Sequence, residues 1–387
     1  VSSILSEPVN NDVQAIEAPV TVFTLSVGKK GVGTNNILIN NVADDGTATN
    51  QRTSYGTGAG QTTQGTSATA LGFNAGQTTQ GAQSVAIGRL AGNNAQSTQS
   101  VAIGNAAGQA AQGSLSVAIG DSAGNLVQGT QTVAVGRLAG NATQGGQSVA
   151  IGNQSGQTTQ GTSAVAIGNL AGQTTQASAS IAIGLASGQL NQSTQSVAIG
   201  RQAGSTTQGS QSVAIGNTAG NLTQGTSSVA IGDIAGSTTQ GSQSVAIGST
   251  AGSTNQAASS VAIGPQSGTI NQATLNVAIG KLAGNNTQGT QSVAIGNLAG
   301  QTTQGSSSVA IGNQVGTTNQ AGSCVAIGNL AGFTTQATQS VAIGNTAGQT
   351  TQATQSVAIG NAAATTTQGS SSVAIGNQSG TTMQGTQ

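Results

Sequence analysis

Apolar residues recur along most of this chain in a short unit that returns every 16 residues. From Thr53 to Gln387 the unit Val-Ala-Ile-Gly, or a variant of it, opens each of 21 repeats with no insertion or deletion. We number the first residue of each repeat, for example Val101, as position 1. Valine and isoleucine alternate with a small alanine, which predicts a short β-strand with Val and Ile on one face and Ser and Ala on the other. The second half of the repeat is extended in character and polar on both faces.

Glycine marks two phases of the repeat. Position 4 is glycine in all 21 repeats and position 8 in 20 of them, Ala364 being the exception. A glycine that recurs at one phase indicates a backbone corner with positive φ or a close approach. We therefore interpret Gly104, Gly108, Gly216 and Gly220 as structural corners, with two turns per repeat. A helix is disfavoured, because each interior glycine would cost it about 1 kcal/mol.

A strict period without insertions predicts an all-β fold, a parallel β-solenoid (β-roll) of 21 coils of 16 residues. Successive coils would stack about 4.8 Å apart, so that the rod is on the order of 100 Å long and each repeat position forms a column along it. Position 12 is glutamine in every coil. We expect these side chains to form a glutamine ladder of axial amide bonds, represented by Gln112, Gln128, Gln144 and Gln160.

Residue choice separates inside from outside. Position 2 is alanine in 20 of 21 coils, which fits a cramped interior, whereas all six charged residues of the repeats occupy position 5, which predicts a solvent-facing corner. If the alanines fill the coil, positions 1 and 3 form an apolar stripe on its outside. Such a stripe predicts a cyclic homo-oligomer built around residues such as Val101, Ile103, Val117 and Ile119.

Residues 1–52 differ in kind from residues 53–387, the β-solenoid repeat domain. They hold most of the acidic residues and two strand-like runs, at 20–27 and 37–42. We predict an N-terminal cap or docking arm, because an open solenoid end exposes unpaired strand edges. The chain begins at Val1 without a leader and its last coil has no comparable cap, so we expect a processed or partial chain whose far end is truncated or covered by another subunit.

Composition excludes several classes of function. Charged residues make up 4% of the chain, seven basic and seven acidic, so no electrostatic field favours nucleic acid or an anionic membrane. There is no histidine and one cysteine, which leaves no disulfide framework, metal site, cofactor site or nucleophile–base pair, and we expect no enzyme activity. No apolar run approaches the roughly 20 residues of a transmembrane helix. Disorder fits the composition but not the period, and ice binding is disfavoured because adjacent threonines in a strand point to opposite faces.

The unit Ser-Val-Ala-Ile-Gly, as at 100–104 and 212–216, resembles the head repeat of trimeric autotransporter adhesins, the YadA-like family. The resemblance covers residues 53–387 and implies a left-handed parallel β-roll in which three chains pack around a common axis. This chain departs from the family in its longer coil, its glutamine-rich second half and the lack of a neck, stalk or membrane anchor within the sequence. Similar repeats occur in surface proteins of phages and large viruses.

These observations predict a structural, adhesin-like surface fibre that is extracellular or lies on a cell or virion surface. Its outer columns of Asn, Gln, Thr and Ser would bind a host surface, matrix or polysaccharide through many weak polar contacts. Its principal partner would be itself, as a homotrimer. The alternative is a self-polymerising filament subunit that joins end to end through the N-terminal arm.

Overall fold

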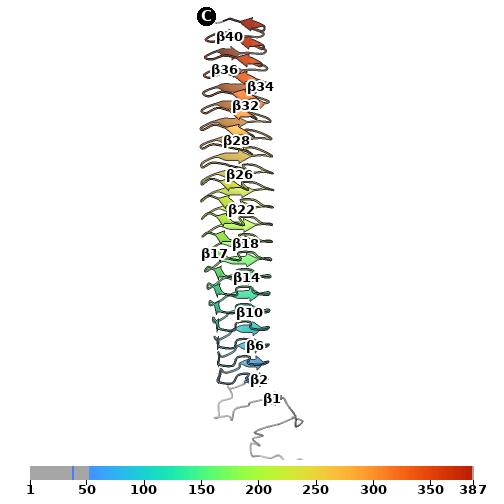
Figure 1. The fold of residues 1–387 in the computed structure, drawn as a ribbon, viewed down its shortest axis with the longest axis vertical. Coiled ribbons are helices and arrows are strands. Elements are labelled where there is room, and N and C mark those ends of the chain that lie inside the picture. Colours follow the sequence, from blue (N-terminus) through green and yellow to red (C-terminus); the bar gives the residue numbers. More distant parts are fainter. Residues whose placement is uncertain (1–36, 39–51, 386–387) are drawn as a thin grey trace, which may run out of the picture.

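The computed structural model of the chain describes residues 37–38 and 52–385, and in them the polypeptide winds into a rod of stacked coils (Figure 1). Each coil is one 16-residue repeat with a strand at positions 1–3 and, in most coils, a two-residue strand at positions 11–12. The described residues contain no helix. The predicted all-β parallel solenoid of 16-residue coils is therefore confirmed.

The strands at positions 1–3 form one face of the rod. They run from β2 (Thr53–Tyr55) and β4 (Thr69–Leu71), at 16-residue intervals, to β40 (Val373–Ile375). Neighbours pair in parallel with each position opposite its own equivalent, because the repeat has no insertions. Two strands, β32 (Val309–Asn313) and β34 (Val325–Asn329), are five residues long and extend through the first glycine.

The two-residue strands form the second face in two separate sheets. One has 12 strands, from β3 (Thr63–Gln64) to β25 (Thr239–Gln240). The other has seven, from β29 (Thr287–Gln288) to β41 (Met383–Gln384). Between them only single glutamine pairs at position 12 bridge neighbouring coils.

The gap between these sheets coincides with two consecutive asparagines at position 11. Asn255 and Asn271 have φ values of 123° and 51°, outside the strand region. In most coils the N–H of position 11 donates to the position-10 carbonyl of the next coil, as Thr223 does to Thr238 at 3.1 Å. That rung is missing at Thr239, Asn255 and Asn271, so the second face is locally weakened.

The coil has two turns, as predicted, but both glycines lie at the first one. Gly104 (φ 130°) and Gly108 (φ 52°) bound the turn at positions 5–8, and Gly216 and Gly220 do the same with φ of 134° and 53°. The second turn lies at positions 14–15 and contains a non-glycine residue in the left-handed region, such as Gln99 at φ 55°.

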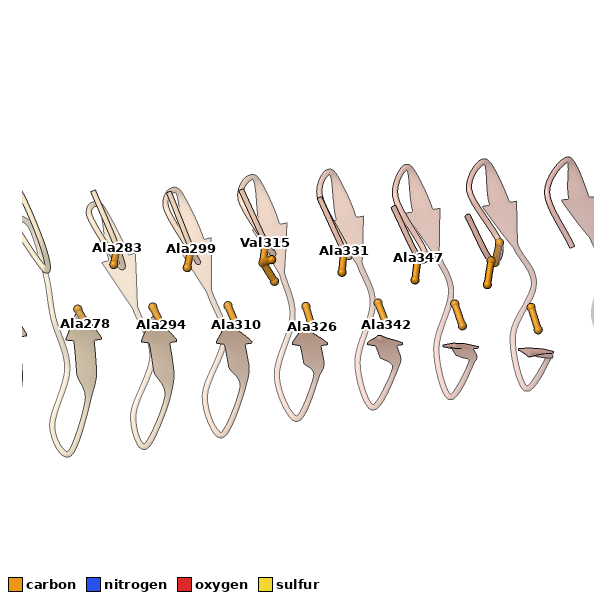
Figure 2. Packing of buried hydrophobic residues seen from close by; sticks show 14 residues of the cluster. Ala278, Ala283, Ala294, Ala299, Ala310, Val315, Ala326, Ala331, Ala342 and Ala347 are labelled. Carbon is orange, nitrogen blue, oxygen red and sulfur yellow. The ribbon is translucent and has the colours of Figure 1, made fainter. Parts of the chain in front are cut away.

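The core is a double row of alanines. Alanines at position 2 project from the long strands toward position 7 on the opposite side of the coil, as Ala294 and Ala299 do in Figure 2, and both rows are buried in all but the end coils. Val315 is the one larger apolar residue in this stretch of the core. An interior this narrow explains why aromatic side chains are so scarce in the repeats.

A short segment before the repeats pairs with the first coil. Strand β1 (Ile37–Leu38) lies antiparallel to β2, with Ile37 opposite Tyr55 and Leu38 opposite Ser54. Of the strand-like run predicted at 37–42, the structure describes the first two residues, and they form this strand. The run predicted at 20–27 and the rest of the predicted cap lie outside the described residues.

Candidate functional site

The position-12 glutamines lie inside the coil, where each ties one face to the other. The Nε2 of Gln112 donates to the carbonyl oxygen of Val101 at 2.7 Å, and Gln128 does the same to Val117 at 2.8 Å. All 21 glutamines make this bond to position 1 of their own coil. The column therefore acts as an internal brace and is not available as a binding surface.

Axial bonds between these glutamines occur in part of the column. Gln160 donates to the Oε1 of Gln176 at 3.1 Å, whereas Gln112, Gln128 and Gln144 donate to backbone carbonyls. The pairs joined along the axis are 160–176, 224–240, 240–256, 272–288, 288–304, 320–336 and 368–384. The cross-coil bond is thus the more regular of the two.

The valines and isoleucines of positions 1 and 3 form a continuous row on the outside of the long strands, which we call the apolar stripe. Val101, Ile103 and Val117 are partly exposed and Ile119 is 37% exposed, whereas the intervening alanines at position 2 are buried. Alternation along the strand produces this division, since neighbouring side chains point to opposite faces. A stripe of this length exceeds the apolar patches that monomers usually expose.

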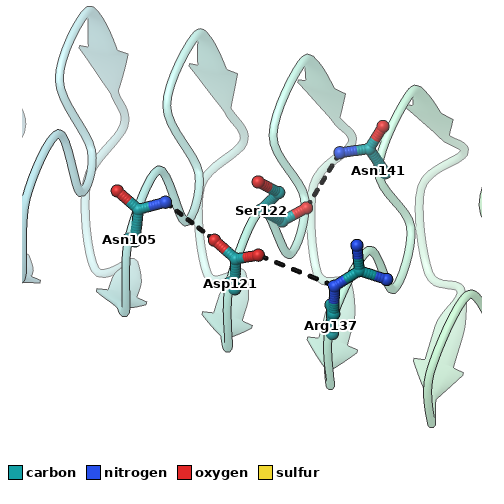
Figure 3. Close-up of polar contacts among 5 residues, drawn as sticks. All are labelled: Asn105, Asp121, Ser122, Arg137 and Asn141. Atoms are coloured by element: carbon teal, nitrogen blue, oxygen red, sulfur yellow. Dashed lines mark hydrogen bonds and ion pairs between the residues drawn. The ribbon is translucent and has the colours of Figure 1, made fainter.

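The position-5 side chains form an exposed polar column beside the first turn. In Figure 3, Asn105 donates to Asp121 at 2.7 Å, and Arg137 lies 3.9 Å from the other carboxylate oxygen of Asp121. Arg89 completes this row by donating to Asn105 at 3.4 Å. Both partners of the ion pair are about half exposed, so it contributes little to stability.

The same order of Arg, Asn and Asp recurs seven coils further along the rod. Arg201 donates to Asn217 at 3.3 Å, and Asn217 donates to Asp233 at 2.8 Å. Charges are therefore placed next to neutral amides or opposite charges within the column. All of these contacts are exposed, so position 5 lies in solvent, as the sequence predicted.

Toward the C-terminal side, position 5 becomes an unbroken run of asparagines, which we call the asparagine ladder. Each Nδ2 donates to the Oδ1 of the next asparagine at 2.9–3.0 Å. Its members are Asn297, Asn313, Asn329, Asn345, Asn361 and Asn377. All of these bonds are exposed, so the ladder is the most regular polar feature of the outer surface.

Asparagines at position 9 have a structural role that the sequence reasoning missed. Asn141 Nδ2 donates to the carbonyl oxygen of Ser122, in the coil before it, at 2.9 Å (Figure 3), and Asn125 does the same to Ala106 at 2.9 Å. These bonds satisfy carbonyls at the first turn. The sequence did contain a signal for this role, because asparagine recurs at position 9 in several repeats.

The described part of the chain offers recurrent hydrogen-bonding surfaces and few chemically reactive groups. Within it, no group of three or more His, Cys, Asp or Glu lies close enough to hold a metal ion. Cys324 is buried in the position-16 column, where its sulfur lies 3.7 Å from the hydroxyl of Ser340. Nor do the described residues include a helix long and apolar enough to cross a bilayer.

Comparison with known families matches the repeats to one model. The YadA head domain repeat (2 copies) matches residues 192–219, 240–267 and 352–379. No curated protein matches the chain. All three matched segments lie within the stacked coils, so sequence and fold agree that the chain carries YadA-like head repeats. The resemblance inferred from Ser-Val-Ala-Ile-Gly is confirmed.

Proposed function

We propose that this chain forms the rod of an adhesin-like fibrous surface protein, with three copies packed around the apolar stripe and the polar columns facing outward. The role is structural and non-enzymatic, and the rod lies on a cell or virion surface or outside the cell. Adhesion would result from many weak polar contacts repeated at each coil, with a host surface, matrix or polysaccharide as the partner.

The apolar stripe is the observation that carries this proposal. Its valines and isoleucines recur in nearly every coil, although the narrow interior is already filled by alanine and glutamine. Side chains that serve only solubility would be polar at these positions. Burial in a cyclic oligomer explains why positions 1 and 3 keep a similar size and apolar character from coil to coil, because each subunit presents the same stripe to its neighbours.

The segment before the repeats fits a capping or docking role in the same assembly. Strand β1 pairs with the open edge of β2 at the start of the rod. An edge covered in this way no longer presents unpaired N–H and C=O groups to another chain. We therefore propose that residues 1–52 close or dock this end of the rod.

Light scattering combined with small-angle X-ray scattering on the full chain tests the trimer. We expect a rod with the mass of three chains. Replacing Ile103 and Ile119 with lysine should reduce the trimer fraction, whereas lysine in place of Asn105 should not, because Lys281 occupies that phase naturally. A monomeric wild-type rod would contradict the trimer, and filaments of unbounded length would favour the end-to-end polymer.

A further inference from the structure

The asparagine ladder is already ordered before any ligand arrives. Its five axial hydrogen bonds all run in the same direction, from Nδ2 of one coil to Oδ1 of the next. Holding each amide in one rotamer removes much of the entropy cost that a flexible side chain pays on binding. The ladder thus has the character of a binding surface that needs no rearrangement.

The backbone beneath the ladder fixes its spacing. The N–H of Gln314 donates to the Asn297 carbonyl, and that of Ala362 to the Asn345 carbonyl, both at 2.8 Å. In the middle of the ladder, Asn313 and Asn329 also pair directly as the last residues of β32 and β34. Successive amides are therefore held one coil apart, about 4.8 Å.

Each amide keeps hydrogen-bonding capacity that the ladder does not use. One N–H of every Nδ2 and one lone pair of every Oδ1 remain for a ligand, and the side chains are exposed. No charged residue follows Lys281, so the ladder is electrically neutral over its whole length. A charged polymer finds no counter-charge here, whereas a neutral polymer with regularly spaced hydroxyl groups finds a donor and an acceptor at every coil.

We propose that the asparagine ladder binds a linear, neutral polysaccharide that lies along the rod axis, with sugar hydroxyls bonded to successive amides. In an extended β-1,4-linked chain, each hexose advances the polymer by roughly the spacing of one coil, about 4.8 Å. Each contact is weak, and affinity comes from their number. This inference rests on the proposed function as a surface rod and assigns its ligand class.

Substitutions at two rungs test the dependence on an unbroken ladder. Asn329→Leu divides the six asparagines into runs of two and three, whereas Asn377→Leu leaves five in sequence. Leucine occupies this phase at Leu185, so both variants are expected to fold. Co-sedimentation of the full chain with insoluble cellulose and with β-1,4-mannan should show affinity reduced roughly tenfold or more by Asn329→Leu, and by less than about threefold by Asn377→Leu.

Salt and a charged polymer supply the remaining controls. Binding should change little with ionic strength and should not be inhibited by heparin, because the ladder carries no charge. Equal losses in the two variants, binding that disappears in salt, or no binding to either polysaccharide would overturn the inference. If such rods still adhere to cells, the proposed function stands without this ligand; if they adhere to nothing, the proposed function fails as well.

Discussion

The side-chain amide of Gln112 donates a 2.7 Å hydrogen bond to the backbone carbonyl of Val101 across the interior of a single coil. The donor lies on the short strand and the acceptor at the start of the long strand, so the bond sets the distance between the two faces. Glutamine has the length and the donor that this distance requires. The same residue at every coil keeps the cross-section of the rod uniform.

Replacing Gln112 with leucine should destabilise the rod. Leucine preserves an apolar stem but leaves the partly buried Val101 carbonyl without this donor, for an expected cost of about 1–3 kcal/mol. Gln99→Ala is the matched control, because Gln99 is exposed and Ala179 occupies the same phase and conformation. Chemical denaturation should show a lower midpoint for the first variant alone, and equal shifts would argue against the brace.

The two glycines of the first turn should differ in their tolerance of alanine. A Cβ on Gly104 would lie 2.5 Å from the carbonyl oxygen of Gly120, and its φ of 130° suits glycine alone. A Cβ on Gly108 would lie 2.9 Å from the side-chain amide of Gln112 and 3.4 Å from the Cβ of Ala102, with no backbone atom among these neighbours, and Ala364 already occupies that phase with φ 48°. We expect about 3 kcal/mol or more for Gly104→Ala and about 1 kcal/mol for Gly108→Ala. Thermal unfolding of both variants measures the difference, and a reversed order would refute this account.

Substitution at position 11 should close the gap between the two sheets of the second face. Replacing Asn255 and Asn271 with threonine, the commonest residue at position 11, should restore the strand and its missing rungs. Hydrogen exchange should then slow at these amides, which we expect to be among the fastest of position 11 in the native rod. Asn191→Thr is the control, because Asn191 already lies in a strand. Unchanged exchange in the double variant would show that asparagine is not the cause of the gap.

Replacing a β-branched residue that lies in the left-handed region should stabilise the rod. Ile234 has φ 59°, whereas Asn74 holds the same phase at φ 52° with a residue that tolerates this conformation. Because Ile234 is 38% exposed, Ile234→Asn loses little burial and should stabilise the rod by about 1 kcal/mol. Ile234→Val keeps the branch and should give no gain. Denaturation midpoints of the two variants decide between conformational strain and side-chain burial.

The sequence predicted those features that depend on local alternation and on the period. Val101 and Ala102 are neighbours in a strand, so their opposite orientations follow from the geometry of extended backbone. The period places every asparagine of the ladder in one column. These relations need no knowledge of how the turns close.

Other features depend on the closed coil and had no local signal. The bond from Gln112 to Val101 requires the width of the interior, which the turns determine. Gln99 adopts a left-handed conformation that its residue type does not favour, because stacking on neighbouring coils imposes the turn. Asn191 and Asn255 share a phase and a residue type but differ in conformation, so their surroundings decide between strand and break.

Within the stack, each long strand pairs only with the long strands of the coil before and the coil after it, as β10 does with β8 and β12. Removing or duplicating 16 residues therefore leaves all contacts intact except at one junction, where equivalent surfaces meet again. Recombination between repeats could lengthen or shorten the protein in whole steps without inventing a new core. The distance between the two ends of the rod is thus set by the number of repeats, and evolution can adjust it separately from the chemistry of the surface.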